Sequence, residues 1–557
     1  MSVVAVDVGT GSVRCAVVRG TDGCILARAV ENTHTHTYEY AGEKHLVQST
    51  DNIWHCICQA TKRAMQASSR GVRSQEVVGV AFDATCSLAV VDKGGSPVSV
   101  LPSNLSSGWN VVLWMDHRAS AEAKEINETQ HAVLDYVGGS ISPEMQIPKI
   151  LWLKRHAYDT CYAKAGHFFD LPDYLTFRAT QSAERSLCSL VCKCTYLEGE
   201  PEDIQGRVRG WQPDFLRLVG LGDLIGDSDT GTTAYERIGT RANPPGSRVG
   251  AGLTEAAALE LGLLPGTPVA AGSIDAHAGV LGVLGAQRGE DLRLDERLAL
   301  IMGTSSCHMA LSRKPLHVSG VWGPYGSVVL GGWWLNEGGQ SASGALVDHV
   351  IIAHCCSHVL VITSSTHLFL LCPSLGVDRG LSSVWHLSRE LHMLPFFHGN
   401  RAPLADASLR GVVSGLHLAS ADPCDDLVEL YVCTLVALAL ETRHIAEAME
   451  QAGHRLRSIH ACGVLSRALA FVQAHADAMQ LPVFLPKDDA VLTGTAVLAA
   501  TAAGCHASLP AAMAAMNASA GVVAPQASVQ SFFDRKFAVY KHMYADFKAY
   551  RALMQAE

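Results

Sequence analysis

The sequence predicts an α/β protein built from two copies of one design, with a cleft between the copies. At 557 residues the chain is too long for one compact core, so two or more domains are expected. A strand, a glycine turn and a second strand occur near residue 10 and again near residue 304. Each arrangement is followed by a helix and a further strand, and the carboxyl ends of such strands face ligand-binding clefts in α/β folds.

The first half begins with two strands around a glycine turn. The apolar runs Val3–Val6 and Cys15–Val18 have the length of strands and flank the letters DVGTGS at residues 7–12, which predicts a β-hairpin. Apolar spacing and turn residues predict the elements that follow. These are a strand at Cys24–Ala29, a helix at Asn52–Ala67, a strand at Val77–Phe82, a helix at Ala251–Leu263 and a strand at Pro268–Ala271.

The second half repeats the opening. Apolar runs at Leu298–Met302 and His308–Leu311 flank the letters GTSS at residues 303–306, and Asp425–Gln451 is apolar on nearly all sides, which predicts a buried helix. A strand at Ser458–Cys462, a helix at Ser466–Met479, a strand at Leu481–Leu485 and a helix at Ala490–Ala503 are expected after it. The predicted domains are residues 1–286 and 287–557.

Composition and charge exclude several classes of partner. The formal net charge is −10 and no Lys/Arg block is present, so neither nucleic acid nor an acidic membrane surface is expected. The first residues lack the pattern of a signal peptide, and no apolar run is long enough to cross a bilayer, which favours a cytoplasmic protein. In that reducing compartment the 17 cysteines are interpreted as small buried apolar side chains.

The repeated glycine turns carry the first chemical hypothesis. A Gly-Thr-Gly loop can present backbone N–H groups and a hydroxyl to an anion, and glycine allows a phosphate to approach closely. A plain two-strand turn is the alternative for a single occurrence. Two occurrences at matching places favour hairpins that hold the phosphates of one nucleotide from both sides, with Asp7 holding a hydrated Mg²⁺.

Six further stretches carry a resemblance to a known family. DVGTGSVR at residues 7–14, WMDHRA at 114–119, GSIDAHAG at 272–279, MGTSS at 302–306, GGQS at 338–341 and HGNRAPL at 398–404 resemble the FGGY family of carbohydrate kinases. DHRA, CSLVCK at 188–193 and GNR are similar to its ribulokinase-like branch. The resemblance covers nearly the whole chain. It implies two duplicated actin-like, hexokinase-like ATPase domains of the ribonuclease H-like type, with an interdomain cleft.

The resemblance also implies an activity. The implied activity is the ATP-dependent phosphorylation of a pentulose, D-ribulose to D-ribulose 5-phosphate, with Mg²⁺ as the cofactor. The resemblance leaves open whether the protein is a homodimer. Two alternatives remain: a kinase for another pentulose or polyol such as xylulose or ribitol, and a catalytically weak pseudokinase that binds sugar or nucleotide. A dehydrogenase is disfavoured because no G-x-G-x-x-G follows the first strand.

Asp275 is the predicted general base. It is a carboxylate at the carboxyl end of a predicted strand, and the small residues after it leave room for a sugar. The alternative is that Asp275 only caps the helix that follows. In the resembled family the aspartate of the DAHAG stretch is catalytic, which favours the first interpretation.

The resemblance extends to the sugar contacts, two of which have open alternatives. Asp116 and Arg118 of the WMDHRA loop either serve the sugar or pair with each other, and Glu144 is either a sugar contact or a solvated surface carboxylate. The residues expected at the sugar, besides Asp275, are Thr85, Cys86, Asp116, Glu144, Lys193 and Glu337.

The residues expected at the nucleotide come from both hairpins and two later turns. Family members usually read Gly-Gly-Leu-Ser-Lys-Asn at the turn that faces adenosine, whereas this chain has Val464 and Ala468 at the second and sixth positions, which leaves the strength of adenine binding open. The expected set is Asp7, Thr10, Gly11, Ser12, Arg14, Gly303, Thr304, Ser305, Gln340 and Gly463.

One segment departs from the resembled family. Residues 349–377 contain no Asp, Glu, Lys or Arg, where relatives usually have a charged helical segment. The pattern is apolar and β-prone, and it is compatible with a buried insertion, an interface or a segment from an aberrant exon. If it does not pack on the second domain, it is an exposed apolar patch.

Overall fold

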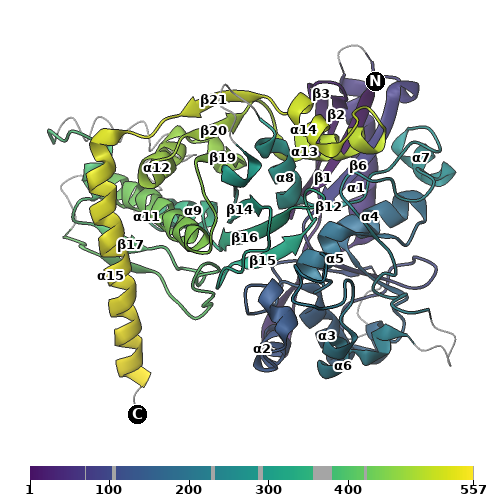
Figure 1. The fold of residues 1–557 in the computed structure, drawn as a ribbon, viewed down its shortest axis with the longest axis horizontal. Coiled ribbons are helices and arrows are strands. Elements are labelled where there is room, and N and C mark those ends of the chain that lie inside the picture. Colours follow the sequence, from purple (N-terminus) through teal and green to yellow (C-terminus); the bar gives the residue numbers. More distant parts are fainter. Residues whose placement is uncertain are drawn as a thin grey trace.

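The chain folds into two lobes that lie side by side, with the two termini in opposite lobes (Figure 1). The computed structural model describes residues 1–68, 71–102, 108–226, 233–286, 293–354, 379–418 and 423–555. In this part of the chain no helix combines the length and the hydropathy that a membrane crossing requires. Of the atypical segment, residues 349–353 end helix α9, and residues 355–377 lie outside the described residues.

The first lobe contains the predicted hairpin at the centre of a five-stranded sheet. Strand β1 is antiparallel to β2 and parallel to β6, and the sheet order is β12-β6-β1-β2-β3. All seven residues of β1 are buried, because a strand in the middle of a sheet that is covered on both faces exposes neither side. The strands are β1 (Ser2–Val8), β2 (Ser12–Arg19), β3 (Ile25–Asn32), β6 (Val77–Ala84) and β12 (Ser273–Ile274).

The second lobe repeats this pairing. Strand β13 is antiparallel to β14 and parallel to β19, in a sheet of order β15-β16-β14-β13-β19-β20-β21. The shared pairing pattern confirms the predicted duplication. The strands are β13 (Arg297–Met302), β14 (Ser306–Ser312), β15 (Trp322–Gly326), β16 (Trp334–Gln340), β19 (Ser458–Cys462), β20 (Val483–Pro486) and β21 (Ser519–Val523).

The remaining strands form smaller sheets. A five-stranded sheet of order β4-β5-β8-β7-β9 extends the first lobe. Its strands are β4 (His36–Tyr40), β5 (Glu43–Gln48), β7 (Leu88–Val91), β8 (Val111–Val112) and β9 (His167–Asp170), and the two short pairs are β10 (Arg185–Ser186) with β11 (Ala242–Asn243) and β17 (His392–Leu394) with β18 (Val412–Ser414).

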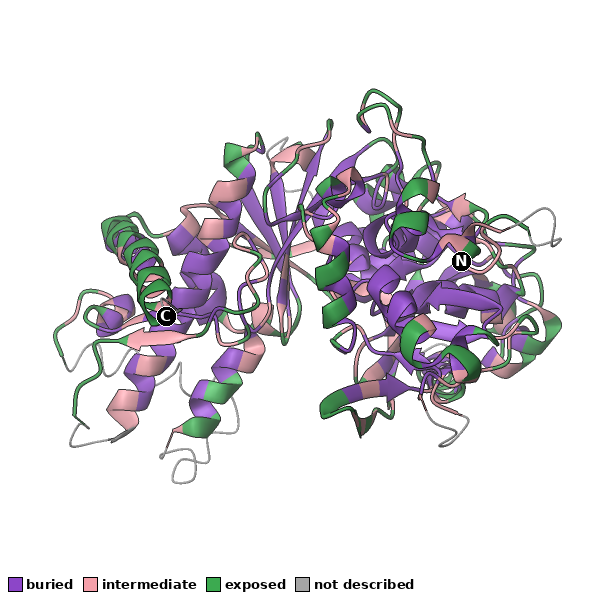
Figure 2. Cartoon of the chain, turned by 90° about the horizontal axis from the view of Figure 1, so that it is seen from below, coloured by how far each residue is buried: buried purple, intermediate pink, exposed green. Residues whose placement is uncertain are grey.

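Helices cover the sheets of both lobes. Figure 2 shows that the strands and the helices packed on them are buried, whereas the long C-terminal helix exposes much of its surface. The helices are α1 (Thr50–Ala67), α2 (Ser120–Glu128), α3 (Gln146–His156), α4 (Leu171–Thr180), α5 (Leu187–Lys193), α6 (Pro213–Leu218), α7 (Glu255–Leu261), α8 (Asp275–Leu284), α9 (Gly344–Ala353), α11 (Pro423–Gln451), α12 (Leu469–Met479), α13 (Ala490–Ala502), α14 (Leu509–Met516) and α15 (Gln530–Gln555).

Two of the predicted elements differ most clearly from the structure. The expected strand at Pro268–Ala271 makes only single pairings, Val269 with Val80 and Ala270 with Arg248, and the strand that joins the sheet is β12 just after it. Helix α12 begins at Leu469, since residues 464–467 form a single 3₁₀ turn. The cysteines that the structure describes are free thiols and most are buried, as predicted.

Helices α8 and α13 cross between the two central sheets (Figure 1). Helix α8 follows the last strand of the first sheet but packs mainly on β13 and β19 of the second, and α13 packs on β1 and β6 of the first. Glycines make the crossing close, because a Cβ atom on Gly494 would lie 1.8 Å from the Ala278 carbonyl oxygen and one on Gly282 would lie 1.8 Å from that of Ala490. The two lobes therefore meet through backbone-to-backbone contact.

Replacing Gly494 by alanine is expected to destabilise the protein. The new methyl group collides with the backbone of α8, which cannot rotate away, so the helices must separate, at a cost of about 1–3 kcal/mol or more. Urea denaturation of the Gly494→Ala variant measures the loss. Gly521→Ala is the matched control, since no atom lies within 4 Å of a Cβ at that position. Equal stability of the two variants would contradict the close crossing.

Candidate active site

Three carboxylates meet where three neighbouring strands end. Asp7 on β1 is paired in register with Asp83 on β6, and Asp83 is paired with Ser273 on β12. Asp275 begins helix α8 directly after β12. Because these strands are parallel, their carboxyl ends lie at one edge of the sheet, and the three side chains are brought together there.

The pKa values of these carboxylates reflect burial and mutual repulsion. Burial raises the pKa of Asp7, although the adjacent Arg14 guanidinium acts to lower it. Burial and the Asp7 carboxylate raise the pKa of Asp83 well above its usual range. Burial, and then Asp7, raise the pKa of Asp275 to about 6, while the Ala276 N–H, which donates to its Oδ1 at 2.7 Å, acts in the opposite direction. The three carboxylates therefore carry more negative charge than the nearby cations neutralise.

Arg14 connects this cluster to the second half of the chain. Its guanidinium forms an ion pair with Asp7, and its Nη1 donates to Asp489 Oδ2 at 2.6 Å. Asp489 also caps α13, since its Oδ1 accepts from the backbone N–H of Leu492. About a third of the Arg14 side chain is exposed, so its charge remains accessible from outside.

The first glycine turn is held from outside through its oxygen atoms. Gln48 Nε2 donates to the Thr10 carbonyl at 2.8 Å, and Trp114 Nε1 donates to the Thr10 hydroxyl at 3.0 Å. The backbone N–H of Thr33 donates to the Gly11 carbonyl at 3.1 Å. Gly11 is exposed at the tip. Ser12 closes the turn, since its carbonyl accepts from the backbone N–H of Gly9.

The second glycine turn is held in the same manner by the start of α9. The backbone N–H of Ser343 donates to the Thr304 carbonyl at 2.9 Å, and that of Gly344 donates to the Gly303 carbonyl at 3.1 Å. Thr304 is exposed. Within the tip, the N–H of Gly303 donates to the Ser305 carbonyl at 2.8 Å.

Gln340 and Gly463 support this second turn. The Gln340 amide is buried and donates to the Leu438 carbonyl at 2.7 Å, while its oxygen accepts from the Ser343 hydroxyl, so it braces the residue that holds Thr304. Gly463 has φ of +98°, and a Cβ there would lie 2.1 Å from the Met302 carbonyl oxygen. Only glycine fits so close to the strand that leads into the turn.

The turn that follows Gly463 exposes the atypical valine. Val464 is 71% exposed, so its branched side chain clashes with nothing among the described residues. The Ser466 hydroxyl donates to the Gly463 carbonyl at 2.7 Å and closes the turn. The consequence of Val464 for adenine binding stays a prediction.

The predicted sugar residues gather beside Asp275 from both halves. Lys193 at the end of α5 lies with its Nζ 4.0 Å from Glu337 Oε2 and 4.6 Å from the centre of the Trp322 ring. The Lys193 and Glu337 side chains are almost fully buried. Burial acts to lower the pKa of Lys193, but the Cys86 thiol and the Glu337 carboxylate raise it well above its usual range.

Glu144 stands in the same group, opposite a cation from the second half. Its Oε1 lies 3.2 Å from Arg401 Nη2 and 3.6 Å from His117 Nε2. Burial acts to raise the pKa of Glu144, but Arg401, His117 and Lys193 together lower it to about 2. Its side chain is only 12% exposed, so the solvated-carboxylate alternative does not describe it.

Thr85 and Cys86 form a buried loop after β6. The Thr85 N–H donates to the Val8 carbonyl at 3.0 Å, which ties the loop to the end of β1. The Thr85 hydroxyl lies 3.1 Å from that of Ser87, and the Cys86 carbonyl accepts from Gln146 Nε2. The loop therefore lies beside the acidic strand ends.

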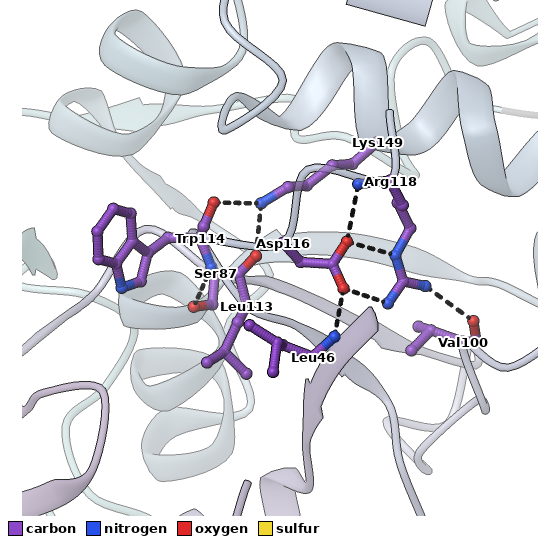
Figure 3. A network of polar contacts seen from close by, with 8 residues as sticks. All are labelled: Leu46, Ser87, Val100, Leu113, Trp114, Asp116, Arg118 and Lys149. Atoms are coloured by element: carbon purple, nitrogen blue, oxygen red, sulfur yellow. Dashed lines mark hydrogen bonds and ion pairs between the residues drawn. The ribbon is translucent and has the colours of Figure 1, made fainter. Parts of the chain in front are cut away.

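Of its two predicted roles, Asp116 has the structural one, because it pairs with Arg118 (Figure 3). Its Oδ1 accepts from the Arg118 N–H and Nε, and its Oδ2 accepts from Arg118 Nη2 at 2.7 Å and from the Leu46 N–H at 2.6 Å. Neither side chain of the pair is exposed. Lys149 fixes the same loop by donating to the carbonyls of Leu113 and Trp114. Asp116 is therefore left out of the proposed sugar contacts.

Replacing Asp116 by asparagine is expected to lower stability and to spare sugar affinity. The change leaves the Arg118 charge buried without its counterion, which costs about 3–5 kcal/mol of unfolding free energy. The KM for the sugar is expected to stay at the wild-type value. The matched control is Glu128→Gln, which removes an exposed pair with Lys124 and costs less than about 1 kcal/mol. A raised KM with unchanged stability would restore Asp116 to the sugar site.

The structure adds residues that the sequence analysis did not assign. Asp83 lies directly after the predicted strand Val77–Phe82 and two residues before Thr85, and Arg401 lies in the HGNRAPL stretch that carried the resemblance. Asp489 follows the end of a predicted strand, which is a weak signal. Trp322 had none, because only the folded chain brings its ring beside Lys193 and within 5.4 Å of the Arg401 guanidinium.

The acidic strand ends fit a hydrated Mg²⁺ ion. Mg²⁺ prefers oxygen ligands and usually keeps several waters, with one or two carboxylates beside substrate phosphates. Asp7 Oδ1 and Asp83 Oδ1 are buried without a hydrogen-bond partner among the described residues, and the two carboxylates repel each other. A divalent cation held by Asp7 through water would offset that repulsion.

Comparison with known proteins identifies the family of the chain. Residues 2–196 match the family model for the N-terminal domain of the FGGY family of carbohydrate kinases, and residues 298–503 match the model for its C-terminal domain. The chain is 44% identical over 562 residues to a human FGGY carbohydrate kinase domain-containing protein, with 99% of this chain and 97% of the relative covered.

Two further relatives extend the comparison. The chain is 35% identical over 528 residues to a D-ribulokinase of Saccharomyces cerevisiae, covering 90% of this chain and 71% of the relative. A solved xylulose kinase of Rhodospirillum rubrum superposes with a TM-score of 0.75 at 18% identity over 99% of both chains. This likeness confirms the predicted two-domain, actin-like ATPase fold. The chain belongs to the FGGY family of carbohydrate kinases and is a phosphotransferase.

Proposed function

We propose that the protein transfers the γ-phosphoryl group of ATP to D-ribulose and forms D-ribulose 5-phosphate, with Asp275 as general base. One observation carries the proposal. The Asp275 carboxylate interacts electrostatically with Asp7 and Arg14, which belong to a first group of residues, and with Lys193, which belongs to a second group. The first group fits a phosphate chain and the second fits a sugar.

Two exposed turns and one cation are suited to hold the phosphates. Thr10 and Gly11 form one tip and Gly303 and Thr304 the other, and partners outside each turn hold their carbonyl oxygens. The tips can therefore offer N–H groups and hydroxyls to an anion. Arg14 adds a charge that lies beside the phosphate position. In this proposal Ser12 and Ser305 complete the turns, Gly463 lies at the adenosine and Gln340 acts only by bracing the second turn.

Directional polar groups on two sides are suited to hold the sugar. Lys193 and Glu337 offer one donor and one acceptor, and Glu144 offers another acceptor fixed by Arg401. Thr85 and Cys86 lie just after the end of β6, next to the end of the strand β1 that carries Asp7. Such fixed partners recognise hydroxyl groups by direction, which is how polar groups confer specificity in a small-molecule site.

The chemistry then requires one proton transfer and one displacement in line. Asp275 takes the proton of the acceptor hydroxyl, the hydroxyl oxygen forms a bond to the γ-phosphorus, and the bond to the β–γ bridging oxygen breaks. A pKa near 6 leaves Asp275 mostly ionised at neutral pH yet basic enough to accept the proton. Mg²⁺, when bound, neutralises charge on the phosphates. Arg14 and Asp7 orient this side of the site.

Similarity to a named relative supports the choice of sugar. The relative at 35% identity is a D-ribulokinase, and this makes D-ribulose the first substrate to test. The stereochemistry of the sugar depends on how Glu144, Lys193 and Glu337 are placed around it. Other pentuloses and polyols present the same kinds of hydroxyl group in different directions.

The test is a coupled assay of ADP release over a panel of sugars. Purified protein with ATP and Mg²⁺ is given D-ribulose, D-xylulose and ribitol, and the product is identified by nuclear magnetic resonance. D-ribulose is expected to have the highest kcat/KM and to carry the phosphate on O5. A higher kcat/KM for another sugar would move the proposal to that substrate. Binding of ATP and sugar without ADP release from any member would overturn it in favour of a pseudokinase.

A further inference from the structure

Two thiols and an imidazole lie together directly behind the proposed sugar residues. Cys188 and Cys192 are four residues apart on α5 and so face the same side of that helix, and His277 projects from the first turn of α8. One ligand atom from each lies within 4.8 Å of the other two. All three side chains are buried.

The spacing is close to that of a tetrahedral metal site. With Zn–S near 2.3 Å and Zn–N near 2.0 Å, the ligand atoms of a zinc tetrahedron are about 3.5–3.8 Å apart. Cys192 Sγ lies 3.4 Å from His277 Nε2. A small contraction of the remaining distances would complete three corners of such a site.

Glu337 lies next to this group and can become the fourth ligand by turning toward the thiols, since it is outside the set of mutually close ligand atoms. Its Oε2 lies 3.8 Å from His277 Nε2, and this buried oxygen has no hydrogen-bond partner among the residues described. Lys193 Nζ lies 4.0 Å from the same oxygen. Two sulfur atoms, one nitrogen and one oxygen form a donor set that zinc accepts.

Charge balance allows this site to be occupied within a buried environment. Two protonated thiols and a neutral imidazole beside one lysine and one glutamate give the metal-free cluster no net charge. Binding of a divalent cation releases two thiol protons, so the net charge of the cluster does not change. A neutral exchange avoids the large cost of burying uncompensated charge.

We propose that Cys188, Cys192, His277 and Glu337 form a binding site for a thiophilic divalent cation such as Zn²⁺, and that the cation and the sugar exclude each other. Exclusion follows because Glu337 cannot serve both. The metal site itself does not depend on the proposed function, whereas its competition with sugar rests on it.

Cobalt gives a direct test, because Co²⁺ bound to thiolates has a charge-transfer absorption and intense visible bands in tetrahedral geometry. Metal-free full-length protein is titrated with Co²⁺ and then with Zn²⁺. One equivalent of Co²⁺ is expected to produce the bands and Zn²⁺ to abolish them. Cys188→Ser and Cys192→Ser are expected to weaken binding by at least about tenfold. Cys433→Ser is the matched control, since this thiol is also buried but lies on α11 and donates to the Leu391 carbonyl.

A second measurement covers variants that fail to fold. In the wild-type chain, Zn²⁺ is expected to slow alkylation of Cys188 and Cys192 by a small maleimide, as mapped by peptide mass spectrometry, and to leave Cys433 unchanged. Absence of the thiolate band, equal cobalt affinity in Cys188→Ser, or no protection of these two thiols would each overturn the site and leave the Cys192–His277 contact as a plain hydrogen bond.

A kinetic measurement tests the metal site and the proposed function separately. With free Zn²⁺ buffered, the KM for D-ribulose is expected to rise by about tenfold, and less in Cys188→Ser. If the cobalt bands appear but Zn²⁺ leaves KM unchanged, the metal site stands and the assignment of Glu337 to the sugar fails.

Discussion

Replacing Asp275 by asparagine is expected to lower kcat by a factor of about 10²–10⁴ while the fold and ATP binding are kept. Asparagine has nearly the same shape and can still accept the hydrogen bond from the Ala276 N–H, but it cannot take a proton from the sugar hydroxyl. The assay is steady-state ADP release, with calorimetry for ATP binding. Glu255→Gln is a matched control, because Glu255 also lies in the first turn of a helix but is exposed.

The same residue sets the expected pH dependence. Because burial and Asp7 raise the pKa of Asp275 to about 6, kcat/KM is expected to fall as the pH decreases through 6, where the base becomes protonated. The contribution of Asp275 to the stability of the fold is expected to change with pH in the opposite direction to kcat/KM. A carboxyl whose pKa is raised by folding favours the folded state below its unfolded pKa, and this contribution is lost as the pH rises through 6.

Asp275→Asn is therefore expected to be at least as stable as the wild type at pH 8, where the wild type carries a carboxylate that burial disfavours. Thermal unfolding at pH 5 and pH 8 measures this. An asparagine variant with wild-type turnover would remove Asp275 from the role of base. Wild-type turnover together with wild-type stability would instead favour the helix-capping alternative, since asparagine caps a helix about as well as aspartate.

Replacing Lys193 by methionine is expected to impair both stability and sugar binding. The Lys193 side chain is 2% exposed, and its Nζ lies 4.0 Å from Glu337 Oε2 and 4.6 Å from the centre of the Trp322 ring. Its loss leaves the Glu337 carboxylate buried without a counterion, which costs about 3–5 kcal/mol of unfolding free energy. The sugar also loses a donor, so its KM is expected to rise by about tenfold or more, since a hydrogen bond to a charged group contributes roughly 1.5–3 kcal/mol.

A double variant separates these two effects. Lys193→Met with Glu337→Gln removes both charges, so most of the lost stability is expected to return, because neither partner is left buried alone. Sugar affinity is not expected to return, since both polar contacts are then altered. Urea denaturation and the KM for D-ribulose measure the two outcomes. Wild-type stability and KM in the single variant would exclude both the ion pair and the sugar contact.

Local sequence was sufficient for the parts of the site that lie on continuous segments. Both glycine turns, the strand before each of them and Asp275 at the start of its helix were predicted from apolar spacing and turn chemistry, and the duplicated fold is confirmed. The failures were also local. The segment Pro268–Ala271 has strand-like composition, but pairing depends on the register with neighbouring segments, and here it forms only single bridges.

Sequence spacing could not decide which polar side chains become partners across the fold. Asp116 was equally compatible with the sugar and with Arg118, and only the folded loop, with the Leu46 N–H aimed at it, settles the pairing. Arg401 and Trp322 meet Glu144 and Lys193 of the proposed sugar site only when the two lobes are assembled. Contacts of this kind depend on three-dimensional position, and residue type alone does not predict which side chains will meet.

The sequence by itself determined a duplicated α/β kinase of the FGGY family, because periodicity, glycine turns and short motifs are properties of continuous segments. The tertiary structure decided which charges meet: Asp83 beside Asp7, Asp489 on Arg14, and Glu337 between Lys193 and His277. The physical reason is that register between parallel strands and the crossing of α8 with α13 bring together side chains hundreds of residues apart, and their burial there shifts their proton affinities.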